Sequence, residues 1–260
     1  MSLPSDKPLQ KLQFYVTTGY PCGYLPNKLA QSLIASPQHL IDASVYSGLI
    51  QQGFRRSGKF AYRPHCESCR ECVSVRVIAD DFKPTRSQKR AYKQHQNLET
   101  TVMPVEYHEE HFALYNAYQM VRHNEALLEK QRQAADQSTA QDGTDQECAE
   151  QDEEDQYRHF LCQTNVESVM VEFRLAGKLK MVSVIDIVID GISAVYTFYD
   201  TTDTQASYGT YNILWQIEWT KILHLPYLYL GYWIKDSRKM VYKEKFQPQE
   251  RLVDGEWLIG

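Results

Sequence analysis

A series of alternating segments toward the C-terminal end most restricts how this chain can fold. Three β-rich segments at 170–175, 179–189 and 194–199 are joined by Ala176-Gly177-Lys178 and Asp190-Gly191, which have the composition of hairpin turns. After a loop, residues 208–223 carry apolar side chains at helical spacing, and a further strand is expected at 227–231. A short structural helix is expected at 236–245. This order predicts an α+β fold in which a long helix separates three antiparallel strands from a strand of parallel type.

The same order resembles that of the GNAT acyltransferase fold. The resemblance implies a GNAT-like acyltransferase domain at 157–260. An N-terminal α/β domain that contains most of the cysteines would cover 1–105 and pack against it, and a helical bridge at 106–130 would follow. The length of 260 residues is sufficient for two domains with hydrophobic cores.

Residues 131–156 interrupt this organisation with an acidic segment. It has nine acidic residues against one basic residue, no aromatic residue and no aliphatic side chain larger than that of Ala. Such a segment cannot bury enough apolar surface to offset the entropy lost on ordering. We therefore expect residues 131–156 to form a disordered acidic insert.

Three cysteines, Cys66, Cys69 and Cys72, are spaced two residues apart in a stretch too polar for a core segment. Thiols at this spacing converge on one point when a metal ion or an iron–sulfur cluster holds them. Cys22, in a turn next to Gly23, would complete a set of four ligands. Zinc and an iron–sulfur cluster both accept such a set, and the sequence does not choose between them.

The chain does not have the features of a secreted or membrane protein. Its six cysteines lack the paired spacings of a disulfide framework, and no apolar run approaches the roughly 18 residues that a bilayer-spanning helix needs. We therefore expect a cytoplasmic protein without membrane association.

A basic region lies within a chain whose net charge is -5. Between Phe54 and His95 there are eleven Lys or Arg residues against four acidic residues. Arg55 and Arg56 lie in the loop 53–58 between two glycines, where planar guanidinium groups can grip a phosphate or a carboxylate. This local excess of positive charge predicts an anionic partner, with nucleic acid as the first candidate.

Several blocks of sequence together resemble the bacterial aspartate/glutamate leucyltransferase family, relatives of the arginyl-tRNA-protein transferases. The likeness covers nearly the whole chain apart from the acidic segment. The principal blocks are Cys22-Gly23-Tyr24-Leu25-Pro26, Gly53-Phe54-Arg55-Arg56-Ser57-Gly58, Tyr62-Arg63-Pro64-His65-Cys66, Ala194-Val195-Tyr196-Thr197-Phe198-Tyr199-Asp200, Gly209-Thr210-Tyr211 and Tyr229-Leu230-Gly231-Tyr232-Trp233-Ile234.

The resemblance implies that Leu is moved from Leu-tRNA to the N-terminal amine of proteins beginning with Asp or Glu, which marks them for degradation through the N-degron pathway. This aminolysis of an activated ester requires no cofactor for its chemistry. The acceptor carboxylate needs a cation, for which Arg55 and Arg56 are the first candidates and Arg76 the next.

For the donor, the resemblance implies that the tRNA end lies over Gly209, Thr210 and Tyr211, and that Tyr199 and Asp200 handle the proton. The stretch Gln205-Ala206-Ser207-Tyr208 before Gly209 lacks the basic residue expected near a phosphate.

Two other functions fit parts of the same pattern. One is a GNAT-type N-acetyltransferase that uses acetyl-CoA, although one glycine stands where its phosphate loop normally has two. The other is a metal-stabilised RNA-binding module without catalytic activity. The residues themselves do not distinguish Leu from Arg as the transferred amino acid.

Overall fold

The computed structural model describes residues 11–133 and 146–260. The helices are α1 (Ala43–Gln51), α2 (Arg86–Gln94), α3 (Glu109–Gln133), α4 (Gln146–Tyr157) and α5 (Tyr208–Ile222), with short helical turns at Gln38–Leu40, Arg158–Cys162 and Val241–Lys245. The strands are β1 (Gln13–Val16), β2 (Tyr20–Pro21), β3 (Leu29–Ala30), β4 (Ser32–Ser36), β5 (Arg55–Ser57), β6 (Phe60–Pro64), β7 (Val73–Ile78), β8 (Glu99–Pro104), β9 (Ser168–Leu175), β10 (Lys178–Val188), β11 (Gly191–Tyr199), β12 (Tyr227–Trp233), β13 (Gln249–Val253) and β14 (Glu256–Ile259). The predicted α+β class is confirmed.

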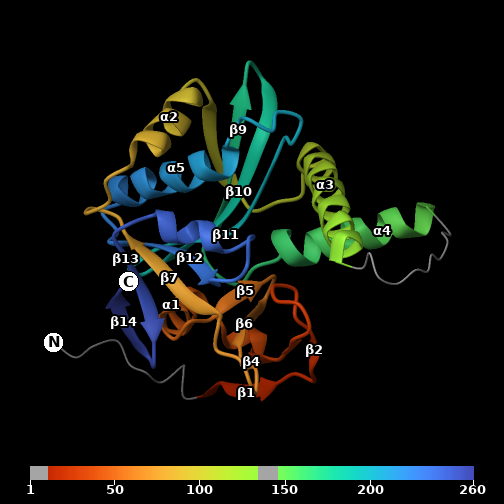
Figure 1. Cartoon of the computed structure of the whole chain (residues 1–260), viewed down its shortest axis with the longest axis vertical. Helices are drawn as coiled ribbons and strands as arrows, with labels where there is room; N and C mark the ends of the chain where they lie inside the picture. The colour runs from red at the N-terminus through yellow and green to blue at the C-terminus, as the bar shows by residue number, and fades with distance from the viewer. Residues whose placement is uncertain (1–10, 134–145) are drawn as a thin grey trace.

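An eight-stranded sheet organises the molecule (Figure 1), with the strand order β14-β13-β7-β12-β11-β10-β9-β8. Strands β7 and β8 come from the N-terminal part of the chain, and β7 lies between β12 and β13. The main sheet therefore combines strands from residues 1–105 and 157–260, which were expected to form separate domains. Hydrophobic periodicity identifies strands but does not say which of them pair, so this interleaving could not be predicted.

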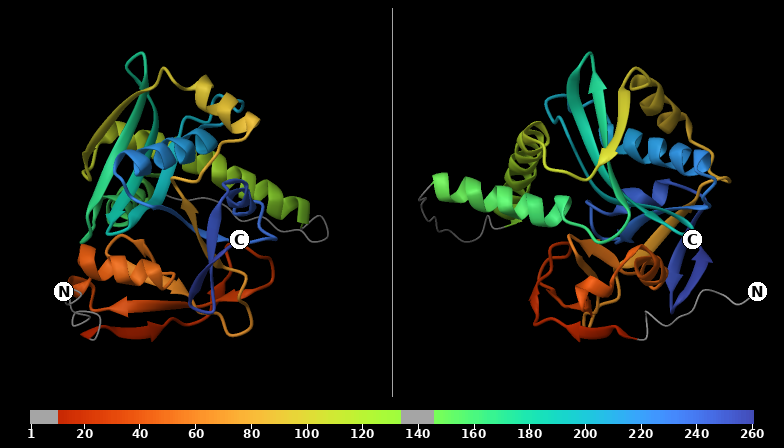
Figure 2. Two further views of the ribbon diagram at one scale, coloured as in Figure 1. Left: turned by 90° about the vertical axis from the view of Figure 1, so that its left-hand side faces the viewer. Right: turned by 180° about the vertical axis from the view of Figure 1, so that it is seen from behind.

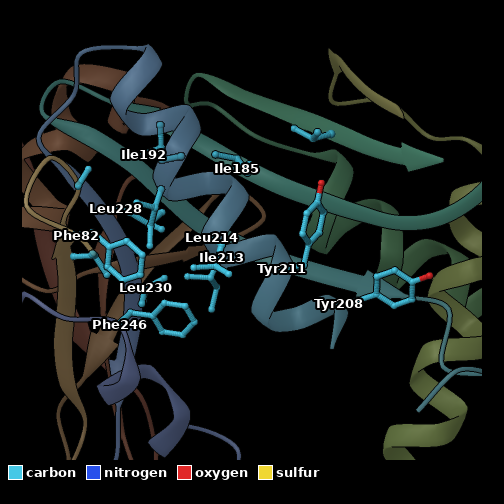
Figure 3. Packing of buried hydrophobic residues seen from close by; sticks show 14 of the residues in the cluster. Phe82, Ile185, Ile192, Tyr208, Tyr211, Ile213, Leu214, Leu228, Leu230 and Phe246 are labelled. Atoms are coloured by element: carbon cyan, nitrogen blue, oxygen red, sulfur yellow. The ribbon is translucent and has the colours of Figure 1, made fainter. Parts of the chain in front are cut away.

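Helices cover both faces of the large sheet, with α2 and α5 on one side and α3 on the other (Figure 2). Side chains alternate between the faces along β10, as expected for a strand. Met181 and Ile185 belong to the core beneath α5, whereas Val182 and Val184 belong to the core beneath α3. Figure 3 shows Ile213 of α5 close to Leu230 of β12 in the first of these cores.

The helix and strands expected at 170–231 are confirmed as β9, β10, β11, α5 and β12. The end of the chain differs from the prediction. The helix expected at 236–245 is limited to a 3-10 turn at Val241–Lys245, and β13 and β14 form a hairpin after it. Within 11–133 and 146–260, no helix is both long enough and apolar enough to cross a bilayer.

Part of the expected disordered insert is helical. Helix α3 continues to Gln133 and α4 begins at Gln146, while residues 134–145 lie outside the described residues. Glu, Gln and Ala have high intrinsic helix propensity. Helix α4 also ends at Tyr157, which is fully buried and packs on the rings of Phe112 and Tyr115. A polar helix can be held in place by one buried apolar residue at its end, which the average composition of the segment does not reveal.

A smaller sheet, with the order β1-β4-β6-β5, lies below the large one together with α1. The two sheets are joined by a buried ion pair between Arg56 of β5 and Asp186 of β10, whose side chains are 2% and 0% exposed. Arg56 Nε donates to both carboxylate oxygens at 2.9 and 2.8 Å, and Nη2 donates to Oδ1 at 2.6 Å. The remaining contacts of the guanidinium are with the Gly58 carbonyl and the Ser168 hydroxyl.

These contacts correct the expectation that Arg56 grips a ligand. All three guanidinium nitrogens of Arg56 already donate to neighbouring groups, and the side chain is not accessible. Arg56 is instead a structural link between the two sheets.

The substitution Arg56→Met should lower the free energy of unfolding by about 3–5 kcal/mol, because it leaves Asp186 buried without its partner. The matched control is Lys221→Met, which removes a partly exposed pair with Glu218 and should cost under about 1 kcal/mol. Urea unfolding followed by circular dichroism measures both. An equal loss in the two variants would contradict the proposed role of the ion pair.

Candidate functional site

The candidate site begins where the parallel strands β11 and β12 separate. Their ladder runs from Gly191 to Ser193 opposite Tyr227 to Tyr229 and ends there. Beyond it, β11 continues beside β10 and β12 continues beside β7. We call the diverging parts, residues 194–199 and 230–233, the β11–β12 fork. Beyond this point, side chains from other elements can form hydrogen bonds with backbone groups of β11 and β12 that would pair with each other in a continuous ladder.

Arg55 enters this fork from β5. Its Nη1 donates to Ser193 Oγ at 2.8 Å, and its Nη2 donates to the carbonyl of Ala194. The guanidinium also lies against Gly231, where an added Cβ would be 3.0 Å from Arg55 Nε and 3.2 Å from Cζ. Gly231 has a φ of 76°, which favours glycine as well. Arg55 thus touches both arms of the fork.

A second cation, Lys243, lies at the same place. It is buried in the turn Val241–Lys245, and its Nζ donates to the Tyr232 carbonyl at 2.6 Å and contacts Met240 Sδ at 3.3 Å. Burial, followed by the positive charge of Arg55, lowers the pKa of Lys243 to about 7. Among the described residues, no carboxylate forms an ion pair with Arg55 or Lys243.

Aromatic hydroxyls surround these two cations. Burial raises the pKa of Tyr24 to about 12 and also raises that of Tyr62, while the charge of Arg55 opposes both shifts. The Tyr232 hydroxyl donates to the carbonyl of Gly53, close to β5. The fork therefore contains cations among neutral hydroxyl groups, an arrangement suited to binding an anion.

Arg76, the other arginine predicted for a ligand, lies elsewhere. Its Nε donates to Glu250 Oε2 at 2.7 Å, and its Nη1 donates to Gln51 Oε1 at 3.0 Å and to the Tyr229 hydroxyl at 2.9 Å. The guanidinium also lies 3.6 Å from the centre of the Tyr227 ring and 4.2 Å from that of Trp257. These contacts correct the expectation for Arg76, since its guanidinium pairs with Glu250 and lies over Trp257 of the terminal hairpin.

The other predicted residues gather where β11 ends and α5 begins. Gly209 and Thr210 are in the first turn of α5, whose amides have no partner within the helix. A Cβ on Gly209 would lie 3.9 Å from the Tyr199 hydroxyl, so these two residues are close. The structure does not expose Tyr211, because its ring packs in the core against Phe173 and its amide donates to the Ser207 carbonyl.

Asp200 accepts a hydrogen bond from Lys180 Nζ at 2.7 Å. Burial alone would raise the pKa of Asp200, but hydrogen bonds from Lys180 and Thr202 outweigh it and lower the pKa to about 2. Asp200 is therefore a weak base at neutral pH.

Lys180 is a basic residue that the sequence did not associate with this site. The pKa of Lys180 is raised mainly by its hydrogen bond with Asp200. Tyr208 raises it to a smaller extent, so Tyr208 is also nearby. Lys180 is distant in sequence from α5, and only the antiparallel pairing of β10 with β11 brings it there.

Cys22, Cys66, Cys69 and Cys72 are partly buried free thiols. Burial raises the pKa of Cys72 to about 12, and the charges of Cys22, Cys66 and Cys69 raise it in the same direction. Within the part of the chain that the structure describes, no three His, Cys, Asp or Glu side chains are already arranged to hold a metal ion.

Comparison with known proteins gives the family of the chain. Residues 20–90 match the family model described as arginine-tRNA-protein transferase, N terminus, and residues 110–253 match that of the C terminus. An aspartate/glutamate leucyltransferase of Methylobacillus flagellatus is 61% identical over 257 residues, which are 99% of this chain and 95% of that protein. Proteins of the same name from Nitrosospira multiformis and Polynucleobacter asymbioticus are 50% and 49% identical, cover 99% of this chain and are themselves covered to 94% and 98%.

Similarity to solved structures is low. The structure of L-PGS from Bacillus licheniformis aligns with a TM-score of 0.39 and 11% identity, covering 63% of this chain and 47% of that chain. This value is too low to define the fold.

The matches over both halves of the chain define it as an enzyme, an aminoacyltransferase of the class that uses aminoacyl-tRNA and protein. Within this class, the chain belongs to the aspartate/glutamate leucyltransferase family. The resemblance seen in the sequence blocks is confirmed.

The substitution Gly231→Ala should reduce aminoacyl transfer about tenfold or more, because the added methyl group displaces Arg55 in the fork. Gly177→Ala is a matched control, since Gly177 has a φ of 78° but nothing within 4 Å of the added Cβ. Both variants should lose about 1–2 kcal/mol of stability from backbone strain. Similar transfer rates in the two variants would show that the position of Arg55 is unimportant.

Proposed function

We propose that the enzyme transfers Leu from Leu-tRNA to the N-terminal amine of proteins whose first residue is Asp or Glu, within the N-degron pathway of protein degradation. The names of the relatives support this donor and these acceptors. The observation that carries it in the structure is the β11–β12 fork, with cations inside it and the start of α5 beside it. Since aminoacyl-tRNA is made and used in the cytoplasm, the proposed reaction belongs there.

We also propose that the strands β9 to β12 with α5 form a GNAT-like transferase unit. Three antiparallel strands are followed by α5 and then by β12, which is parallel to β11 before the two diverge. Such a fork exposes backbone donors and acceptors that can hold an extended donor between the two arms.

The proposed chemistry is aminolysis of the ester that joins Leu to the terminal ribose of tRNA. The neutral amine of the acceptor attacks the ester carbonyl, a C–N bond forms, and the C–O bond to the ribose breaks. The ribose oxygen leaves as a hydroxyl with the proton that the amine loses. The protein mainly aligns the amine with the carbonyl and stabilises the developing oxyanion.

For the tRNA end, we assign the phosphates to the first turn of α5 at Gly209 and Thr210, together with Lys180. Helix amides and an ammonium group both favour a phosphate. Asp200 then orients Lys180, since its low pKa does not suit proton uptake. The Tyr199 hydroxyl, next to Gly209, is our candidate for handling the proton.

For the cysteines, we propose that Cys22, Cys66, Cys69 and Cys72 hold zinc or an iron–sulfur cluster as a structural clamp between the Cys22 turn and β7. The spacing of Cys66, Cys69 and Cys72 with the nearby Cys22 supports this proposal, because soft thiolate ligands select both groups. No step of the transfer passes through this site.

Incubation of a reporter beginning with Glu with labelled Leu-tRNA, Arg-tRNA or acetyl-CoA should give label transfer from Leu-tRNA. Transfer from acetyl-CoA alone would indicate an N-acetyltransferase. RNA binding without transfer from any donor would indicate a binding module. Transfer from Arg-tRNA in preference to Leu-tRNA would contradict the proposed donor.

Metal analysis and absorption spectra of protein purified with and without air should reveal the group at the cysteines. Bound zinc should persist in air without colour, whereas an iron–sulfur cluster should give a visible absorption that air bleaches. Cys69→Ser and Cys72→Ser should lose the metal, and the control Cys162→Ser should keep it. Metal-free protein from both preparations would contradict a cysteine-bound metal.

A further inference from the structure

Lys243 is unusual because a buried lysine normally has an acidic partner. The residue is 6% exposed, and its Nζ donates to a backbone carbonyl and contacts a thioether. An ammonium group has three donors, and a thioether is a weak acceptor. Within residues 11–133 and 146–260, no carboxylate offsets its charge. Burial and the charge of Arg55 therefore disfavour the ammonium form at this position, and the charge of Cys72 opposes them.

Arg55 adds to this imbalance from a different element. Its guanidinium rests on Gly231, and Lys243 Nζ donates to the carbonyl of the next residue, Tyr232. Two cations thus converge on adjacent positions of one strand, and the charge of Arg55 acts directly on Lys243. Such a pair is favourable when an anion lies with them, since opposite charges attract strongly where water is excluded.

We propose that Lys243 is a specificity-determining residue that binds, together with Arg55, the side-chain carboxylate at the first position of the acceptor protein. This inference rests on the proposed function and assigns the acceptor end of its site. A carboxylate can accept from the guanidinium and from the ammonium at once. A first residue of Gln or Asn would leave both cations without a counter-charge, which gives strong discrimination.

The position within the fork agrees with this role. Arg55 binds Ser193, where the fork begins. Tyr199 lies six residues farther along β11, close to Gly209 at the start of α5. Because β11 bulges between Ala194 and Tyr196, this stretch spans five residues of β10, so at about 3.3 Å per residue these ends are about 17 Å apart. The tRNA phosphates and the acceptor carboxylate would therefore occupy opposite ends of the fork.

The test uses the full-length enzyme and two fluorescent peptides with amidated C termini, one beginning with Glu and one with Gln. Fluorescence anisotropy measures their binding without requiring transfer. Lys243→Met removes the charge, Lys243→Arg keeps it, and Lys245→Met is the control, because Lys245 is exposed in the same turn.

Lys243→Met should weaken binding of the Glu peptide about tenfold or more, leave the Gln peptide unchanged, and leave the KM for Leu-tRNA unchanged. Lys243→Arg should retain preference for the Glu peptide, and Lys245→Met should behave as wild type. Thermal unfolding should show Lys243→Met to be folded, since it removes a buried charge without an acidic partner. If that variant does not fold, the Lys243→Arg result decides: loss of the Glu preference would overturn the proposal.

Three other results would overturn it. They are unchanged binding of the Glu peptide by folded Lys243→Met, equal weakening of the Glu and Gln peptides, and a fall in kcat on all acceptors with unchanged peptide binding. Failure of the proposed function is a separate outcome. In that case, no transfer from Leu-tRNA would occur while the Glu preference and its dependence on Lys243 would still be measured.

Discussion

The arrangement of the site depends on the buried ion pair between Arg56 and Asp186. Asp186 stands opposite Ser168 on β9 and Ser193 on β11, so these three residues form a polar row across the large sheet. Arg56 binds the first two, and Arg55 binds the third. Because a buried guanidinium and carboxylate tolerate little displacement, the pair fixes where β5 lies on this row. It thereby fixes the point at which Arg55 enters the fork.

Groups from three distant segments meet at the fork. Arg55 comes from the smaller sheet, Gly231 from the middle of the large sheet, and Lys243 from the turn before the terminal hairpin. Gly231 has no side chain, so the Arg55 guanidinium fits against it. The charge of Arg55 in turn lowers the pKa of Lys243, and an anion bound beside the two cations would offset this repulsion. The same fork ends at α5, where Lys180 and the helix amides can hold phosphate. In the proposed function, one break in a β ladder thus serves two anionic substrates at separate places.

Local patterns in the sequence predicted much of the fold but little of the site. Alternation and helical spacing located β9, β10, β11, α5 and β12, because these signals arise within each element. They did not reveal that β7 and β8 join the same sheet, since pairing partners leave no local trace. Arg55 and Arg56 are identical residues next to each other in the sequence. Only their tertiary contacts distinguish Arg56, which links the two sheets, from Arg55, which lies in the fork. Lys180 was not selected for the same reason: its importance comes from what packs beside it.

The position of β7 between β12 and β13 has a consequence for how the chain acquires its structure during synthesis. β7 is made early, but both of its neighbours in the sheet are made last. Until they emerge from the ribosome, the strand has no partner on either side, and its apolar residues Val75 and Val77 lack the core that later buries them. Contacts between such distant segments close long loops, which slows folding and prolongs the exposure of unpaired strand edges. The N-terminal half therefore depends on the C-terminal half to complete its part of the sheet.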